Sequence, residues 1–263
     1  METGKTRRLR RIFRKDERTV IVPMDHGVSV GPIHGLGDMT KTVSHLLAGG
    51  ADAILVHAGI AKTVNNDNAG LILHLSGATR LTSDPTWKAH LSSVREAIRL
   101  GADAVSVHIN VGSQHEQEML ETFSGIRDEC EDNGIPTLAM MYPRGPNVPN
   151  EHAFEAVIHA ARLGYELGAD IVKTNYTGDV DNFRQIVQSV KAPVVLAGGP
   201  KAKTDSDALN MVAEGMRAGA SGVSIGRNIF QHENPTAMTR AIVNIVHENQ
   251  TLEKALAILR EPP

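Results

Sequence analysis

Four similar segments recur along the chain, and each runs from a glycine and an alanine into a stretch of apolar residues. They begin at Gly50, Gly101, Gly168 and Gly219. Each follows a helical hydrophobic pattern, so its glycine is expected to end a helix in the left-handed conformation. The apolar stretch is typical of a buried parallel strand. The spacing from 50 to 101 and from 168 to 219 corresponds to a pair of β–α units.

Further strands are expected between these repeats. They cover Thr19–Met24, Leu71–Leu75, Pro136–Met141 and Pro193–Ala197. The helical patterns before the repeats cover Val43–Ala48, Val94–Leu100, Val157–Leu167 and Met211–Ala218. Eight strands that alternate with helices predict an α/β fold, a (β/α)8 TIM barrel with its active site at the carboxyl ends of the strands. No linker-like segment divides the chain, so residues 1–263 are expected to form a single domain.

Lys173 closes the apolar stretch of the third repeat and is the leading candidate for a catalytic residue. Burial at the end of a barrel strand disfavours the ammonium form, and a neutral amine can attack a carbonyl carbon. The structural alternative is a lysine whose stem lies on the barrel while its head reaches water.

Asp25 and Tyr142 also follow predicted strands, so both side chains can face the barrel axis next to Lys173. Amine chemistry on a ketone needs a proton donor and a proton acceptor, and these two groups can serve. The alternatives are a helix-capping or turn carboxylate for Asp25 and a phenol bonded to the backbone for Tyr142.

A phosphate site is predicted at the ends of the last two strands, where Gly198, Gly199 and Gly226 expose backbone N–H groups. Arg227 can add a fork of donors. The alternative is that these glycines only form tight turns. His26 is expected to be a hydrogen-bonding residue of the pocket, because no second ligand at a suitable spacing suggests a metal.

Composition excludes several classes of function. A net charge of −3 gives no basic field for nucleic acid, and no run of 18 apolar residues could span a membrane. The single cysteine, Cys130, fits a reducing cytoplasm. The basic stretch Arg7–Arg11 is expected to lie on a solvated terminal helix. No motif indicates a metal or another cofactor.

Together the strand-end motifs resemble the archaeal-type class I aldolase family. The resemblance runs from about Arg7 to Leu259, with the motifs in family order. It is carried by the segments Met24–Pro32, Met141–Gly145, Lys173–Asp179, Gly198–Lys201 and Gly226–Phe230. It implies a Schiff base at Lys173, a proton-shuttling acid at Asp25, a proton-donating phenol at Tyr142 and phosphate contacts from the two glycine loops.

Ser29 favours the transaldolase branch of this family, because the fructose-bisphosphate aldolase branch has a glutamate at that position. The reaction implied is transfer of a three-carbon fragment from a phosphorylated ketose, 6-deoxy-5-ketofructose 1-phosphate, to the amino-aldehyde L-aspartate semialdehyde. The resemblance also implies a cytoplasmic homo-oligomer, often a decamer, that needs no metal.

Arg144 could bind the carboxylate of the amino-aldehyde, or it could pair with a neighbouring carboxylate or a subunit interface. Two other functions remain open at this stage. One is a class I fructose-1,6-bisphosphate aldolase, and the other is a non-catalytic sugar-phosphate binder.

Overall fold

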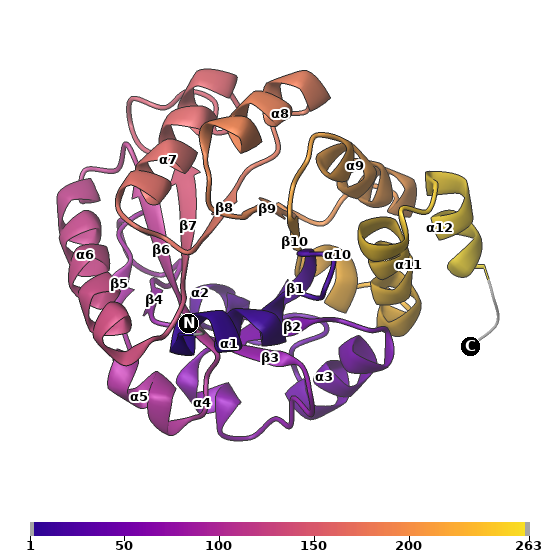
Figure 1. Ribbon diagram of the computed structural model, residues 1–263, viewed down its shortest axis with the longest axis horizontal. Helices are drawn as coiled ribbons and strands as arrows, with labels where there is room; N and C mark the ends of the chain where they lie inside the picture. Colours follow the sequence, from indigo (N-terminus) through magenta and orange to yellow (C-terminus); the bar gives the residue numbers. More distant parts are fainter. Residues whose placement is uncertain (1–2, 261–263) are drawn as a thin grey trace.

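Eight parallel strands close into a barrel in the computed structural model, which describes residues 3–260 (Figure 1). Their order around the barrel is β1-β10-β9-β8-β7-β6-β3-β2. The strands are β1 (Thr19–Pro23), β2 (Ala53–Val56), β3 (Gly70–His74), β6 (Ala104–Val111), β7 (Thr137–Pro143), β8 (Ile171–Thr174), β9 (Val194–Ala197) and β10 (Gly222–Ser224). Each overlaps one of the eight strands expected from the sequence, and the predicted (β/α)8 fold is confirmed.

Helices surround the barrel in Figure 1. They are α1 (Gly4–Ile12), α2 (His26–Val30), α3 (Met39–Ala48), α4 (Ala58–Ala61), α5 (Val94–Arg99), α6 (Glu116–Asn133), α7 (Phe154–Glu166), α8 (Val180–Ser189), α9 (Asp205–Arg217), α10 (Arg227–Phe230), α11 (Pro235–Glu248) and α12 (Leu252–Ile258). The helix predicted from Met211 begins earlier, at Asp205, because Thr204 and Asp207 form a capping box at its start. None of the helices within residues 3–260 is long and apolar enough to cross a membrane.

All four repeat glycines adopt the left-handed conformation that the sequence predicts. Their φ angles are +91° at Gly50, +73° at Gly101, +86° at Gly168 and +97° at Gly219. A side chain at these positions would be strained, so glycine is required where each helix turns into the next strand.

The aspartate in three of the repeats fixes the pairing of neighbouring strands. Oδ2 of Asp103 accepts the backbone N–H of Leu71 in β3 at 3.0 Å. Oδ2 of Asp170 accepts the backbone N–H of Thr137 in β7 at 2.8 Å. Each carboxylate lies just before one strand and accepts a backbone N–H at the start of the neighbouring strand. This role was not predicted from the sequence.

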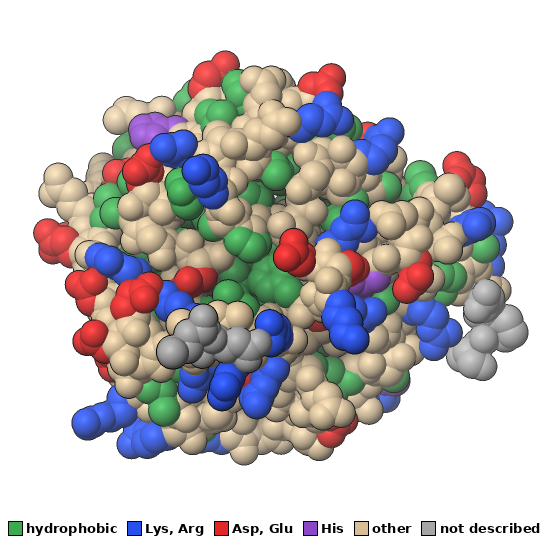
Figure 2. Space-filling view, viewed as in Figure 1, with side chains coloured by type: hydrophobic (Ala, Val, Ile, Leu, Met, Phe, Trp, Pro, Cys, Tyr) green, Lys and Arg blue, Asp and Glu red, His purple; other side chains and the backbone are tan. Residues whose placement is uncertain are grey.

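Helix α1 lies across the amino ends of the strands and carries the basic stretch, and Arg7, Arg10 and Arg11 are exposed as the sequence predicts. Ile12 is completely buried and packs with residues of the barrel interior. Lys5 pairs with Asp170 at 2.9 Å, and Arg11 pairs with Asp103 at 3.0 Å. Lys and Arg side chains gather over this region in Figure 2. Two basic residues of α1 therefore pair with two of the three repeat carboxylates.

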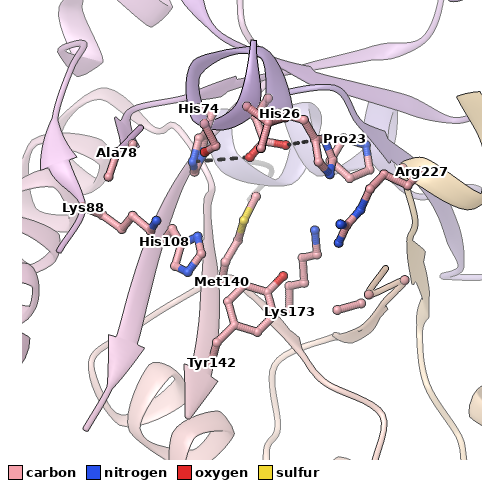
Figure 3. A pocket seen from close by; sticks show the side chains of 18 of the residues that line it. Pro23, His26, His74, Ala78, Lys88, His108, Met140, Tyr142, Lys173 and Arg227 are labelled. Carbon is pink, nitrogen blue, oxygen red and sulfur yellow. Dashed lines mark ion pairs between the residues drawn. The ribbon is translucent and has the colours of Figure 1, made fainter. Parts of the chain in front are cut away.

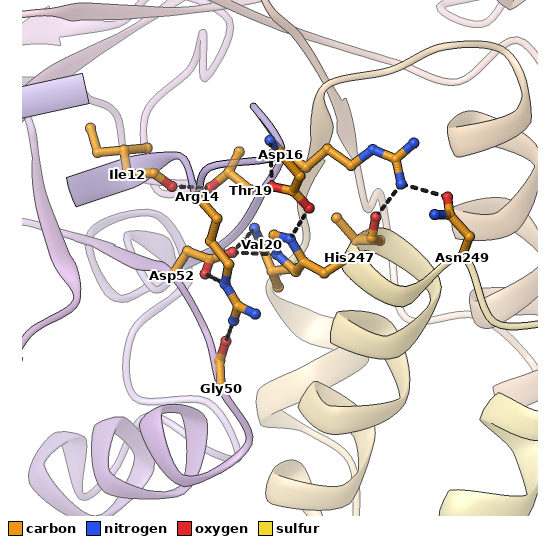
Figure 4. Close-up of polar contacts among 11 residues, drawn as sticks. Ile12, Arg14, Asp16, Thr19, Val20, Gly50, Asp52, His247 and Asn249 are labelled. Atoms are coloured by element: carbon orange, nitrogen blue, oxygen red, sulfur yellow. Dashed lines mark hydrogen bonds and ion pairs between the residues drawn. The ribbon is translucent and has the colours of Figure 1, made fainter. Parts of the chain in front are cut away.

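Asp52, the carboxylate of the first repeat, belongs to a larger polar network (Figure 4). Its Oδ2 accepts the backbone N–H of Val20 and lies 2.8 Å from Nε2 of His247, and Oδ1 pairs with Arg14. Nδ1 of His247 lies 2.8 Å from Asp16. Burial lowers the pKa of His247, but its bonds to Asp52 and Asp16 outweigh burial and raise it. The network joins β1, the start of β2 and α11.

We expect Asp103→Ala to lower the free energy of unfolding by about 1–3 kcal/mol, because the substitution leaves the buried N–H of Leu71 without an acceptor. Urea unfolding would measure the change. Asp128→Ala is the matched control, since its ion pair with Arg127 lies at the surface. Equal stability of the two variants would contradict a structural role for the repeat carboxylates.

The carboxyl ends of the strands carry an extra hairpin that helps to build the site. Strand β3 is followed by β4 (Ser76–Gly77), which pairs antiparallel with β5 (Ala89–His90). Residues of the intervening loop line the cavity described next.

Candidate active site

A cavity of about 620 Å³ opens at the carboxyl ends of the barrel strands. It brings together Lys173 from β8, Tyr142 from β7 and Asp25 from the end of β1, although these residues are far apart in the sequence. Figure 3 shows Lys173, Tyr142 and Arg227 pointing into the same space, with Lys88 and His108 at its other side. The predicted grouping of Lys173, Asp25 and Tyr142 is therefore geometrically possible.

Lys173 lies within the barrel and is 5% exposed. Its strand pairs with β7 at Met140 and with β9 at Val195, so the stem is held on both sides. Within the described part of the chain, the amine makes no hydrogen bond or ion pair. Because the stem is held in place and the amine is not paired with a carboxylate, the amine can approach a carbonyl carbon in the cavity.

Asp25 occupies the N-cap position of α2, but its carboxylate makes no capping bond. The capping alternative is therefore wrong. Its oxygens lie 3.6 Å from Nδ1 of His26 and 3.8 Å from Nε2 of His74. Burial raises the pKa of Asp25, but in the acidic range where the carboxyl titrates its electrostatic interactions with His74, His26 and Lys173 outweigh burial and hold the pKa below its ordinary value. The carboxylate is thus ionised and can accept a proton.

His74 lies beside Asp25 and was not singled out by its motif. The ring is 2% exposed, and its Nδ1 lies 2.7 Å from Oγ of Ser106. Burial lowers the pKa of His74 to about 4 although Asp25 opposes the shift, so the ring is neutral at neutral pH. His57 contacts its ring and bonds its backbone carbonyl. The position of His74 at the end of a predicted strand was the available signal.

Tyr142 stands between two other polar side chains. Its ring meets the ring of His108 at 4.9 Å between centroids, and the guanidinium carbon of Arg144 lies 4.6 Å from its centroid. Among residues 3–260 its phenol has no hydrogen-bond partner, so the alternative of a backbone-bonded hydroxyl is wrong. The phenol remains available to a bound substrate.

The glycine loops after β9 and β10 line one end of the cavity. Gly199 has a φ of +62°, and a Cβ on Gly226 would stand 2.5 Å from the carbonyl oxygen of Pro23. Both positions therefore need glycine for backbone reasons, as the tight-turn alternative states, and both also border the cavity. Asn228 secures the first loop by donating to the carbonyl of Gly198 at 3.0 Å.

Three buried polar atoms at this end have no hydrogen-bond partner within the described residues: Nε of Arg227, Oγ of Ser224 and Nδ1 of His26. Burial lowers the pKa of Arg227, and the neighbouring charges of Arg80 and Arg144 lower it further. Buried donors without partners favour an anionic ligand. Helix α10 has only four residues, so its dipole adds little.

Arg144 lines the cavity, but a neighbouring carboxylate occupies part of its guanidinium. Its Nε donates to Glu151 at 2.5 Å, and Glu151 also accepts Nδ2 of Asn175 at 3.3 Å. The pairing that was expected as an alternative is therefore present, and Arg144 is held in place beside Tyr142. Within residues 3–260 no group of three or more His, Cys, Asp or Glu side chains is placed to hold a metal ion.

Comparisons with known proteins agree on the family. A model of the DeoC/LacD family of aldolases matches residues 19–232. The chain is 45% identical to a 2-amino-3,7-dideoxy-D-threo-hept-6-ulosonate synthase of Halobacterium salinarum, over 97% of this chain and 96% of the relative. It is 38% identical to a 2-amino-4,5-dihydroxy-6-oxo-7-(phosphonooxy)heptanoate synthase of Streptomyces griseus, over 95% and 93% of the two chains.

A solved structure of a Schiff-base-forming fructose-1,6-bisphosphate aldolase is also similar. It is 35% identical, with a TM-score of 0.87, over 92% of this chain and 99% of that chain.

Proposed function

Because the chain belongs to the DeoC/LacD family of aldolases, we propose that it is a Schiff-base transaldolase. It moves a three-carbon fragment from 6-deoxy-5-ketofructose 1-phosphate to L-aspartate semialdehyde. The product is 2-amino-3,7-dideoxy-D-threo-hept-6-ulosonate, a precursor of 3-dehydroquinate and the aromatic amino acids. The observation that carries this proposal is the amine of Lys173, buried in a cavity with Asp25 and Tyr142. Family membership also argues against a non-catalytic binder.

The names of the two relatives support the choice of acceptor. Both products are seven-carbon acids with an amino group at C2 and a ketone at C6. A lysine can hold the ketone carbon, so C5 to C7 correspond to the transferred fragment. C1 to C4 then correspond to a four-carbon aldehyde with an amino group and a carboxylate, which is aspartate semialdehyde.

The reaction begins when the amine of Lys173 adds to the ketone next to the methyl group, and water leaves to give an iminium ion. The iminium nitrogen draws electrons as the bond between C3 and C4 of the donor breaks. Asp25 accepts the hydroxyl proton of C3, and an aldehyde bearing the phosphate departs. An enamine of three carbons remains on Lys173.

The enamine carbon then attacks the aldehyde carbon of aspartate semialdehyde and forms the new C–C bond. The phenol of Tyr142 donates a proton to the aldehyde oxygen as negative charge develops there. Water hydrolyses the resulting iminium ion, which frees the product and the amine, and the proton held by Asp25 returns to the phenolate of Tyr142. The same lysine thus serves both steps. Its nitrogen accepts the electron pair of the C–C bond that breaks and returns an electron pair to the C–C bond that forms.

Incubation with both substrates tests this function. Mass spectrometry should detect the seven-carbon amino acid only when the ketose phosphate and aspartate semialdehyde are both present. Release of the phosphate-bearing aldehyde should match the amount of product. Absence of the seven-carbon product under these conditions would contradict the transaldolase.

A class I fructose-1,6-bisphosphate aldolase is the second candidate. Cationic side chains stand at both ends of the cavity, Arg227 at one and Lys88 at the other, which suits a ketose with two phosphates. Ser29 favours the transaldolase instead. Incubation with fructose 1,6-bisphosphate alone separates the two, because only an aldolase would release triose phosphates.

Arg227→Ala should weaken the binding of fructose 1,6-bisphosphate by about 1.5–3 kcal/mol, the usual contribution of a hydrogen bond to a charged group. The reason is that Arg227 supplies the cation at the glycine-loop end, beside a ketone held on Lys173. The concentration dependence of borohydride trapping gives the affinity. Arg217→Ala, at an exposed position on α9, is the control. An unchanged affinity would place the phosphate elsewhere.

We also propose that the protein is a cytoplasmic homo-oligomer, with a decamer as the expected size. The single cysteine, Cys130, is buried and supports a reducing compartment. Light scattering on the purified protein tests the assembly, and a monomer at micromolar concentration would contradict it.

A further inference from the structure

Lys88 lies at the end of the cavity opposite the glycine loops (Figure 3). The loops follow β9 and β10; β9 is four places around the barrel from β3, and β10 is four places from β6. Lys88 is carried by the loop between β4 and β5, and His108 of β6 lies beside it in the figure. The cavity therefore has a cationic group at each end, with Lys173 between them.

The ammonium of Lys88 has no carboxylate partner. Its Nζ donates to the carbonyl of Pro85 at 2.6 Å, and within residues 3–260 it forms no ion pair. Burial lowers the pKa of Lys88, and the like charge of Arg144 lowers it further, although Asp25 and Asp84 oppose the shift. A partly buried cation that faces another cation gains from an anion bound between them.

The other groups at this end are less able to bind an anion alone. Burial holds the pKa of His108 well below its ordinary value, so the ring is neutral, and its Nε2 lies 2.8 Å from Oδ1 of Asn110. Arg144 is already paired with the carboxylate of Glu151. Lys88 is thus the cation at this end of the described cavity that lacks a protein counter-charge.

The proposed reaction requires an anion site on the aldehyde side of the C–C bond that breaks. In the departing aldehyde the phosphate is at the end of the molecule away from the aldehyde carbon. In aspartate semialdehyde the carboxylate is likewise at the end away from the aldehyde carbon. Tyr142, which would protonate the aldehyde oxygen, contacts both His108 and Arg144. The aldehyde half of each substrate therefore faces the Lys88 end.

We propose that Lys88 binds the α-carboxylate of the amino-aldehyde acceptor, and that Arg144 assists from its place on the ring of Tyr142. This assignment rests on the proposed transaldolase. The same subsite holds the phosphate of the departing aldehyde before the carboxylate enters. The glycine loops and Arg227 then face the C7 end of the bound fragment, where the product of the Streptomyces griseus relative has its phosphate.

Acceptors with and without a carboxylate test the assignment in a Lys88→Met variant. The enzyme is first loaded with the three-carbon fragment at saturating ketose phosphate, because loss of Lys88 also weakens donor binding. Transfer to aspartate semialdehyde is then compared with transfer to succinic semialdehyde, which keeps the carboxylate, and to butanal, which lacks it. Lys62→Met, an exposed lysine paired with Glu96, is the matched control.

The variant should lose about 10–100-fold in kcat/KM for both carboxylate-bearing aldehydes, as expected for a charge-assisted hydrogen bond. Transfer to butanal should stay within about twofold of the wild-type value, and Lys88→Arg should restore most of the loss. An equal loss with butanal, or no loss with aspartate semialdehyde, would overturn the assignment. A wild-type enzyme that traps no donor would instead refute the transaldolase itself.

Discussion

Replacing Lys173 by methionine is expected to abolish both imine trapping and turnover while the barrel stays folded. Methionine keeps an unbranched apolar stem in the same buried place, so the packing between β7 and β9 should survive. It removes the amine, and without an amine no iminium ion can form. Borohydride reduction with a ketose phosphate followed by intact-mass measurement tests the loss, and circular dichroism tests the fold.

Lys191→Met is the control for this experiment, because Lys191 is exposed and lies just before β9. The control should trap substrate like the wild type. If the Lys173→Met variant still forms a reducible adduct, another lysine is the nucleophile and the assignment of Lys173 is wrong.

Tyr142→Phe should slow turnover by about 10²–10⁴-fold, the usual loss when a general acid is removed. The ring contacts with His108 and Arg144 remain in phenylalanine, so the fold and part of the imine formation should be kept. Single-turnover measurements can separate rapid imine formation from slow transfer. A variant with full activity would remove Tyr142 from the mechanism.

Asp25→Asn should be similarly slow, because an amide cannot accept the hydroxyl proton. The pKa of Asp25 is already held below its ordinary value, so the wild-type carboxylate is ionised throughout the neutral range. The amide of the variant has no carboxyl to ionise, so raising the pH should not rescue it. Rescue at high pH, or full activity at neutral pH, would contradict a proton-accepting role for Asp25.

The barrel could be predicted from the sequence because its signals are local. Each repeat places a helix, a left-handed glycine and an apolar strand within a short stretch of chain, and hydrophobic periodicity reports such features directly. The predicted ends of the strands also place Lys173, Asp25 and Tyr142 on one face, since parallel strands share one carboxyl edge.

Interactions across the barrel could not be predicted in this way. Arg11 meets Asp103 across 92 positions of sequence, and only barrel closure brings them together. Lys88 follows no strand pattern, and its place in the cavity depends on the short β4–β5 pairing. Arg144 likewise meets Glu151 only through the path of the loop that follows β7.

The most direct test of the account is the mass of the adduct trapped on Lys173 after borohydride reduction with 6-deoxy-5-ketofructose 1-phosphate. A transaldolase should carry a three-carbon fragment without phosphate on the peptide that contains Lys173, and prior addition of aspartate semialdehyde should discharge it. A trapped fragment that aspartate semialdehyde leaves in place, or no adduct at Lys173, would contradict the proposed transfer.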